Sequence, residues 1–293
     1  MKRAVCLSWL LALAGLSACT YHVRESNVVI PRVGPAVDMA VLRERLPDYR
    51  IEEKRIAAEG ADLYSLRFLR KDAVATVLYF GGNGYTVAKF APHSAQAYAG
   101  VPVNFVLVDH RGYGGSTGTA SLDALLADAV QVYDDLRGDA GLHGLPLVVH
   151  GHSLGSFMAG NVAARRKLDG LVLEGSVTTS EEWTAYLRSR QKWWARALVW
   201  RVVPEGALAG KGNRDVAAAL DEPALFVAGE DDVTAPPRFA HALFDSAPLP
   251  GDRKRLLTVP GHDHMNAAQS PQFRDALAAF IAAIAAQTQA PAG

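Results

Sequence analysis

The stretch LPLVVHGHSLG, residues 145–155, leads from an apolar strand through a Gly-x-Ser-x-Gly turn into a helix. Residues 145–149 have the length and composition of a strand covered on both faces, and helical spacing follows over residues 154–166. The chain must turn sharply at Ser153, where flanking glycines relieve crowding around a strained residue. Free N–H groups at the start of a helix favour a developing negative charge. We predict that Ser153 is a nucleophile; the alternative is a Gly/Ser turn without activity.

Strand and helix patterns alternate on both sides of this turn. We predict strands at residues 51–57, 63–69, 75–80, 103–108, 145–149, 170–173, 224–228 and 255–259, and helices at residues 87–99, 122–136, 154–166 and 272–287. Such alternation is typical of an α/β fold, in which helices cover both faces of a mostly parallel central sheet. Ligands of these sheets bind beyond the carboxyl ends of the strands, where Ser153 is expected.

Residues 178–214 break the alternation, and they contain four of the five tryptophans, namely Trp183, Trp193, Trp194 and Trp200. We interpret this region as a small helical cap inserted between two strands of one domain, residues 51–293. The aromatic residues of the cap either line an apolar pocket or pack the cap onto the body, because tryptophan is mostly buried on average.

Two further motifs are YFGGNG at residues 79–84 and DHRGYGGSTG at residues 109–118. Together with the turn at Ser153, they resemble motifs of serine hydrolases of the α/β-hydrolase superfamily over about residues 51–286. The resemblance implies an oxyanion hole formed by the backbone N–H groups of Asn83 and Leu154. Gly81 stands where histidine is common, but a backbone role does not need that side chain. We interpret residues 109–118 as a loop scaffold in which Asp109 pairs with Arg111.

The same resemblance implies the chain order serine, acid, histidine. Three carboxylates follow the strand at residues 224–228, and the spacing from Gly229 favours Asp232 over Asp231 and Glu230. Glu174, at the end of an earlier strand, is a weaker alternative. The chosen acid would orient the histidine and stabilise its charged form.

The histidine is expected after the last strand, in the run PGHDHMN at residues 260–266. The family pattern Pro-Gly-x-x-His selects His264 over His262. A neutral imidazole takes the proton of the serine and returns it to the leaving group. We expect the side chain of His152 to point away from the nucleophile and His150 to be packed in the interior.

The N-terminus has the features of an export signal. Lys2 and Arg3 precede an apolar stretch at residues 4–16, and the run Leu-Ser-Ala before Cys19 resembles a bacterial lipobox. We predict a lipoprotein signal peptide at residues 1–18, lipidation (for example by palmitate) at Cys19 and a tether at residues 19–50 with a short helix at 37–45. By resemblance to Gram-negative lipoproteins, Thr20 after Cys19 favours an outer-membrane location facing the periplasm.

Composition excludes several other classes of function. The chain has 293 residues, 49% of them hydrophobic, and its 30 Lys and Arg balance its 30 Asp and Glu. Without a basic stripe we expect no nucleic-acid partner, and without Cys/His metal spacing we expect no metal or other cofactor. We predict a serine hydrolase that cleaves carboxylic esters or thioesters of a small-molecule or lipid-like acyl substrate. The alternatives are a serine peptidase or amidase and a non-catalytic envelope lipoprotein that uses the fold for binding.

Overall fold

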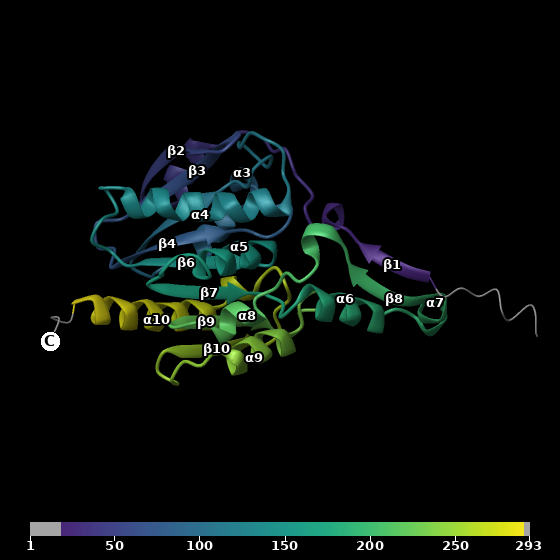
Figure 1. The fold of residues 1–293 in the computed structure, drawn as a ribbon. Coiled ribbons are helices and arrows are strands. Elements are labelled where there is room, and N and C mark those ends of the chain that lie inside the picture. The colour runs from purple at the N-terminus through teal and green to yellow at the C-terminus, as the bar shows by residue number, and fades with distance from the viewer. Residues whose placement is uncertain (1–18, 290–293) are drawn as a thin grey trace, which may run out of the picture.

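The computed structural model describes residues 19–289, so the predicted signal peptide lies outside the described residues. The body is built around one eight-stranded sheet (Figure 1). In sheet order its strands are β10 (Lys254–Val259), β9 (Ala224–Gly229), β7 (Gly170–Glu174), β6 (Leu147–His152), β4 (Ala75–Phe80), β5 (Val103–Val108), β3 (Ala61–Leu69) and β2 (Arg50–Ala58). The six strands from β10 to β5 are mutually parallel, and β3 and β2 continue the sheet by antiparallel pairing.

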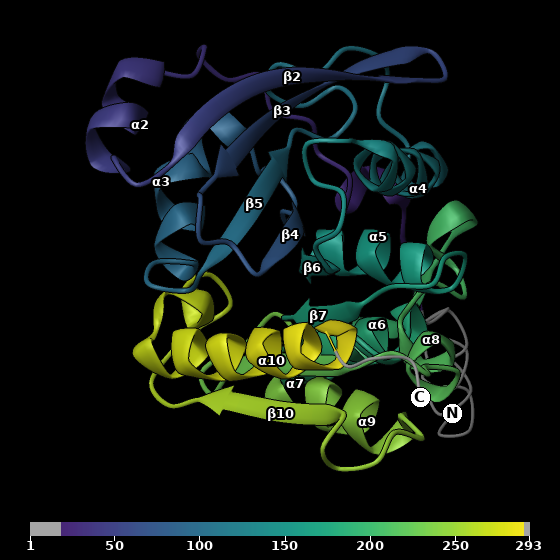
Figure 2. The same ribbon diagram turned by 90° about the vertical axis from the view of Figure 1, so that its left-hand side faces the viewer.

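Helices cover both faces of this sheet (Figure 2). One face carries α4 (Leu122–Gly138), α5 (Leu154–Ala163), α8 (Arg214–Ala218) and α9 (Pro237–Ser246), and the other carries α2 (Met39–Arg45), α3 (Val87–Ala97) and α10 (Pro271–Gln289). Within β6, Leu147 and Val149 pack on the first face and Val148 packs on the second. Burial on both faces explains why the central strands are continuous apolar runs. The predicted α/β fold with a mostly parallel sheet is confirmed.

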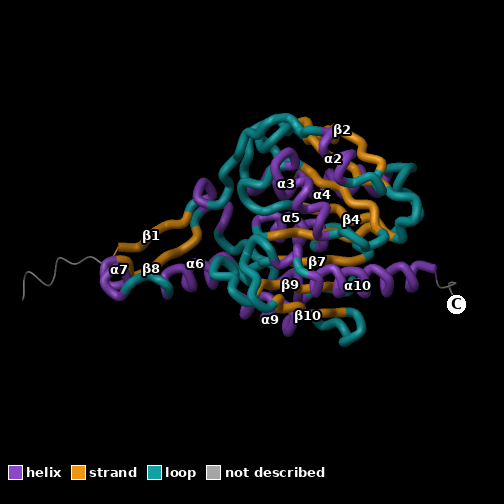
Figure 3. The backbone as a smooth tube through the Cα atoms, turned by 180° about the vertical axis from the view of Figure 1, so that it is seen from behind, coloured by secondary structure: helices purple, strands orange, loops and turns teal. Residues whose placement is uncertain are grey.

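A part of the chain that we call the arm extends from the body (Figures 1 and 3). The arm consists of β1 (Cys19–Val23), α6 (Ser180–Ser189), α7 (Trp193–Leu198) and β8 (Val199–Pro204). Strand β1 pairs in parallel with β8 in a separate two-stranded sheet, and the Glu205 N–H donates to the Val23 carbonyl at 2.9 Å beyond it.

The arm corrects two predictions. The region at 178–214, expected to contain only helices, includes β8, and the tether at 19–50 begins with β1. Each strand completes its hydrogen bonds through a partner about 180 residues away in sequence, which a local pattern does not reveal. The short helix expected at 37–45 is α2, which begins at Met39 because the Asp38 carboxylate accepts hydrogen bonds from the N–H groups of Ala40 and Val41.

Three tryptophans of the arm face solvent. The exposed fractions of Trp193, Trp194 and Trp200 are 81%, 52% and 66%. The expectation that Trp193 and Trp194 pack the cap onto the body is therefore wrong. Of the four tryptophans in residues 178–214, Trp183, on α6 at the base of the arm, contacts the core of the body and lines a pocket, as expected of an aromatic residue of the cap. No helix within residues 19–289 is long and apolar enough to cross a membrane.

Candidate active site

Ser153 occupies the turn between β6 and α5 in a strained backbone conformation. Its φ of 53° makes it the one non-glycine residue with positive φ among residues 19–289. The turn is tight: a Cβ at Gly151 would lie 2.3 Å from the Gly155 carbonyl oxygen, and one at Gly155 would lie 2.0 Å from the Phe80 carbonyl oxygen. Only glycine fits at both positions, so the Gly-x-Ser-x-Gly pattern follows from the packing. The strain holds the serine hydroxyl at the carboxyl edge of the sheet.

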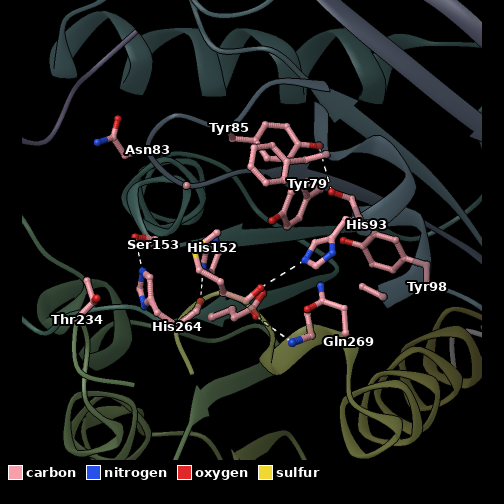
Figure 4. Close-up of a pocket in the computed structure, with 17 residues that line it drawn as sticks. Tyr79, Asn83, Tyr85, His93, Tyr98, His152, Ser153, Thr234, His264 and Gln269 are labelled. Atoms are coloured by element: carbon pink, nitrogen blue, oxygen red, sulfur yellow. Dashed lines mark hydrogen bonds between the residues drawn. The ribbon is translucent and has the colours of Figure 1, made fainter. Parts of the chain in front are cut away.

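Ser153, His264 and Asp232 form a continuous chain of hydrogen bonds across this edge. The distance from Ser153 Oγ to His264 Nε2 is 2.9 Å, and that from His264 Nδ1 to Asp232 Oδ2 is 2.7 Å. Figure 4 shows the imidazole of His264 directed at Ser153. The three residues come from three separate loops, after β6, β9 and β10, so only the parallel sheet brings them together.

The surroundings of Asp232 fix its carboxylate. Asp232 is 3% exposed, and its Oδ1 accepts hydrogen bonds from the N–H groups of Thr234 and Ala235 at 2.7 and 2.8 Å. The other oxygen, Oδ2, is thereby left for His264. Buried carboxylates need such partners, because desolvation of an unpaired charge is costly.

The competing candidates lie elsewhere. Asp231 and Glu230 are exposed, and the Glu230 carboxylate accepts a hydrogen bond from the Gly261 N–H. A ring nitrogen of His262 lies 2.8 Å from the Pro260 carbonyl oxygen. Glu174 is buried, but its Oε2 lies 3.1 Å from His150 Nε2, and it does not contact His264 through a hydrogen bond.

The loop after β4 lies against the nucleophile. A Cβ at Gly82 would lie 3.2 Å from Ser153 Cβ, and Asn83 lines the same cavities as Ser153. Within the described chain, the backbone N–H groups of Asn83 and Leu154 have no hydrogen-bond acceptor. The Asn83 side chain points away from Ser153 (Figure 4), and its Oδ1 accepts from the Ile30 N–H and the Tyr113 hydroxyl.

Steric crowding explains why position 81 is glycine. A Cβ at Gly81 would lie 2.1 Å from Cγ of Tyr85, whose buried ring fills the space beside the loop. The histidine that is common at this position in the family therefore has no room here.

Residues 109–118 hold this loop in place. Asp109 accepts hydrogen bonds from the Val87 N–H at 2.6 Å and the Gly115 N–H at 2.7 Å, and His110 Nε2 lies 2.8 Å from the Gly81 carbonyl oxygen. Burial raises the pKa of Asp109 to about 6, although its two N–H donors oppose the shift. The expected Asp109–Arg111 pair is wrong, because Arg111 binds Asp128 through two hydrogen bonds.

Four polar residues lie behind the turn, and of these the sequence suggests only Glu174 for the site. His150 is buried and links the Tyr98 hydroxyl, 2.9 Å away, to Glu174. His152, expected to point away, lies against His264: its Nε2 donates to the His264 carbonyl oxygen at 2.7 Å, and the two rings are 4.9 Å apart. Burial lowers the pKa of His152, which favours the neutral ring. The sequence signal for His152 was only its place beside Ser153.

Two cavities meet at Ser153 and His264, and Asn83 and Thr234 also line both. The cavity of about 220 Å³ has the more polar lining of the two, with Tyr79, Tyr85, His93, Tyr98, Glu174 and Gln269 beside the apolar Phe90, Ala97, Met265 and Ala268, and we call it the polar cavity (Figure 4). The apolar cavity, of about 170 Å³, is lined by Val28, Leu122, Phe157, Val177, Trp183 and Leu208. A substrate bound across Ser153 would thus place one part in each cavity. Among the described residues, no group of three or more His, Cys, Asp or Glu side chains is arranged to hold a metal ion.

Comparisons with known proteins agree with this fold. A family model described as "Serine aminopeptidase, S33" matches residues 71–216, about half of the chain. An esterase structure from Pyrococcus furiosus superposes with a TM-score of 0.65 at 14% identity, covering 87% of this chain and 97% of that one. An esterase from Thermogutta terrifontis superposes with a TM-score of 0.57 at 17% identity, covering 80% of this chain and 99% of that one.

Sequence relatives extend the similarity. "Lysophosphatidylserine lipase ABHD12" of Danio rerio is 28% identical over 251 residues, which are 77% of this chain. The chain spans about three fifths of the length of that relative, 62%. "Protein bem46" of Schizosaccharomyces pombe is 24% identical over 260 residues, 82% of this chain and 81% of the relative. The chain has the α/β-hydrolase fold, and these matches support its membership of the α/β-hydrolase superfamily.

Proposed function

We propose that the chain is a serine hydrolase that cleaves carboxylic esters or thioesters through an acyl-enzyme. The observation that carries the proposal is the hydrogen-bonded chain Ser153–His264–Asp232, with distances of 2.9 and 2.7 Å. Such a chain activates a serine hydroxyl, which is a weak nucleophile by itself. The lipase and esterase relatives support the same class of reaction.

Each residue then has a defined role. Ser153 Oγ attacks the acyl carbonyl while His264 Nε2 takes its proton, and Asp232 stabilises the imidazolium through Nδ1–H. The N–H groups of Asn83 and Leu154 receive the oxyanion, each donor contributing about 3–4 kcal/mol to the transition state. His264 returns the proton to the leaving group, and water then releases the acyl group by the same steps in reverse.

The two cavities suggest how the substrate binds. The apolar cavity suits the acyl chain, because its lining is mostly aliphatic and aromatic side chains. The polar cavity, with its tyrosine hydroxyls and Glu174, suits a polar alcohol or thiol leaving group. A lipid-like acyl substrate with a polar headgroup fits this division.

A fluorophosphonate probe tests the reaction class directly. The folded protein is expected to be labelled at Ser153, and Ser153→Ala is expected to block labelling. Folded protein that is not labelled would instead support the alternative of a non-catalytic envelope lipoprotein. A panel of p-nitrophenyl esters, thioesters and aminoacyl amides of increasing acyl length then separates an esterase from a peptidase or amidase, the activity named in the matching family model.

For location, we propose that residues 1–18 are a lipoprotein signal and that Cys19 is lipidated on the bacterial envelope, at the outer membrane facing the periplasm. The lipobox-like run before Cys19 supports this proposal. Several acyl chains anchor a protein stably, whereas one chain does so only marginally. Labelling cells with an alkyne-tagged palmitate is expected to mark the wild-type protein and not Cys19→Ala. Equal labelling of both proteins would exclude Cys19 as the acceptor.

A further inference from the structure

The arm presents an exposed aromatic surface that the catalytic chemistry does not use. Trp193, Trp194 and Trp200 are 81%, 52% and 66% exposed, and Leu198 and Tyr21 are 52% and 53% exposed. All five lie on β1, α7 and β8. Scattered exposed apolar residues are ordinary, but a cluster of large ones on one small element is typical of an interaction site.

The charge of the same segment is one-sided. Between Trp183 and Pro204 the chain has five Arg or Lys residues and no Asp or Glu, although the whole protein has no net charge. Lys192, Arg196 and Arg201 are exposed and form no ion pair with another residue of the described range. Their charges are therefore available to an anionic partner.

Tryptophan and cationic side chains together match the interface of a phospholipid bilayer. Tryptophan concentrates at the headgroup level, where its ring is buried and its N–H stays hydrated, and Arg and Lys bind anionic headgroups. Trp and Arg are also enriched at protein interfaces, but Lys is depleted there. We propose that the tip of the arm, formed by α7, β8 and the start of β1, docks into the interface of a membrane that contains anionic phospholipid.

The position of the arm supports this occupant. Cys19 begins β1 and lies at the end of the arm farthest from the body, beside α7 (Figures 1 and 3). A lipid at Cys19 would bring the tip of the arm, rather than the body, to the bilayer surface. The arm would then fix the orientation of the enzyme, which a flexible anchor alone does not do.

The base of the arm leads into the apolar cavity. Trp183 of α6 lines that cavity, and so do Val28, which follows β1, and Leu208, which follows β8. The wall of the apolar cavity formed by these three residues therefore lies on the side of the body from which the arm extends.

Depth-dependent fluorescence quenching tests the docking without any catalytic step. The mature protein, which begins at Cys19 and so lacks Trp9 of the predicted signal peptide, is bound to vesicles of phosphatidylglycerol and phosphatidylcholine, with and without brominated acyl chains. Brominated lipid is expected to lower the tryptophan emission by roughly half, since three tryptophans lie at the tip. The triple variant Trp193→Phe/Trp194→Phe/Trp200→Phe is expected to lose this quenching, and Trp183→Phe is expected to keep it. Equal emission from vesicle-bound protein on both lipids would overturn the proposal, whatever the enzyme hydrolyses.

Charge is tested separately. Lys192→Glu/Arg196→Glu/Arg201→Glu is expected to reduce quenching on vesicles with phosphatidylglycerol and not on pure phosphatidylcholine. The matched control Arg43→Glu/Lys71→Glu/Lys167→Glu reverses three exposed charges of the body and is expected to behave as the wild type. If both variants lose quenching equally, net charge explains the binding and the arm has no specific role.

Discussion

The carboxyl edge of the sheet and the tip of the arm reverse the usual positions of polar and aromatic residues. At the edge, Asp232 is buried at 3% exposure and each of its oxygens accepts a hydrogen bond. At the tip, Trp193 is 81% exposed and packs in no core cluster. The hydrogen bonds of the buried carboxylate only offset its cost of desolvation, and an exposed aromatic side chain gains no stability from burial. Both regions therefore indicate function, the first in chemistry and the second in binding.

The largest expected effect is a loss of catalysis at the sheet edge that leaves membrane docking of the arm unchanged. Ser153→Ala should lower kcat by about 10⁵–10⁶-fold, because the members of such a triad act as a unit. The same variant should keep the quenching of tryptophan by brominated lipid, since the arm makes no contact with the Ser153 hydroxyl. Steady-state kinetics and vesicle fluorescence on one preparation measure both. Loss of membrane docking in Ser153→Ala would show that the two regions are coupled.

A smaller effect tests the choice of acid at the edge. Asp232→Asn should lower kcat by about 10⁴-fold, because the amide no longer stabilises the charged imidazole or its correct tautomer. Asp231→Asn is the matched control, one residue away and exposed, and should leave kcat nearly unchanged. Glu174→Gln should change kcat less than Asp232→Asn does. A larger loss in Glu174→Gln or Asp231→Asn would assign the acid to that residue.

The buried Asp109 predicts a pH-dependent stability of the body. Its pKa is about 6 in the folded protein, against an ordinary aspartate value of 3.8. Between these values the folded state binds the proton and the unfolded state does not, so the contribution of Asp109 to the free energy of unfolding falls as the pH rises from 4 to 6. The shift corresponds to about 3 kcal/mol.

Denaturant unfolding at pH 4 and pH 6 measures this dependence. Asp109→Asn removes the titrating group, so the variant should lack about 2 kcal/mol of this fall, the part of the shift that titrates between pH 4 and pH 6. Equal falls in the wild type and in Asp109→Asn would contradict the assignment of the pH dependence to this carboxyl.

Asn83 distinguishes a backbone role from a side-chain role. Asn83→Ala keeps the backbone N–H proposed for the oxyanion but removes the acceptor of the Ile30 N–H and the Tyr113 hydroxyl. Stability should fall by about 1 kcal/mol while kcat changes little. Thermal melting and kcat are the two measurements. A loss of kcat at full stability would assign the Asn83 side chain itself to the reaction.

The smallest expected effect is on the free energy of unfolding, when an ion pair of the arm is removed. Glu205 lies 3.2 Å from Arg24 and 3.6 Å from His22, and all three side chains are about half exposed or more. Glu205→Gln should change the free energy of unfolding by less than about 1 kcal/mol, because exposed ion pairs contribute little. It should leave both kcat and vesicle docking intact. A large loss of stability would mean that the arm is part of the cooperative core of the body.

Most of the body could be predicted because its information is local. A strand covered on both faces is a short apolar run, and β4, β5, β6, β7 and β9 each show one. The turn at Ser153 is partly local, since Gly151 is forced by Gly155 and Ala159 of the same strand–turn–helix unit, whereas Gly155 is forced by Phe80 at the distant end of β4. Helix α9 was not among the predicted helices, although its buried residues Phe239, Ala240 and Leu243 have helical spacing.

The arm could not be predicted because its information is not local. Strand β1 is a strand only because β8, distant in sequence, supplies its hydrogen bonds. Burial also depends on the tertiary structure. Tryptophan is usually a core residue, but Trp193, Trp194 and Trp200 are exposed because no part of the body covers them. Likewise, the role of His152 depends on a contact with the backbone of His264, 112 residues away.

The sequence by itself determined the α/β fold, the turn that presents Ser153 and the candidates Asp232 and His264, because apolar periodicity and motif spacing act over a few residues. Only the tertiary structure decided which carboxylate meets His264, which two cavities flank Ser153 and where the arm points. These features depend on the distances between segments that the sheet and the paired strands bring together, and a linear pattern does not contain those distances.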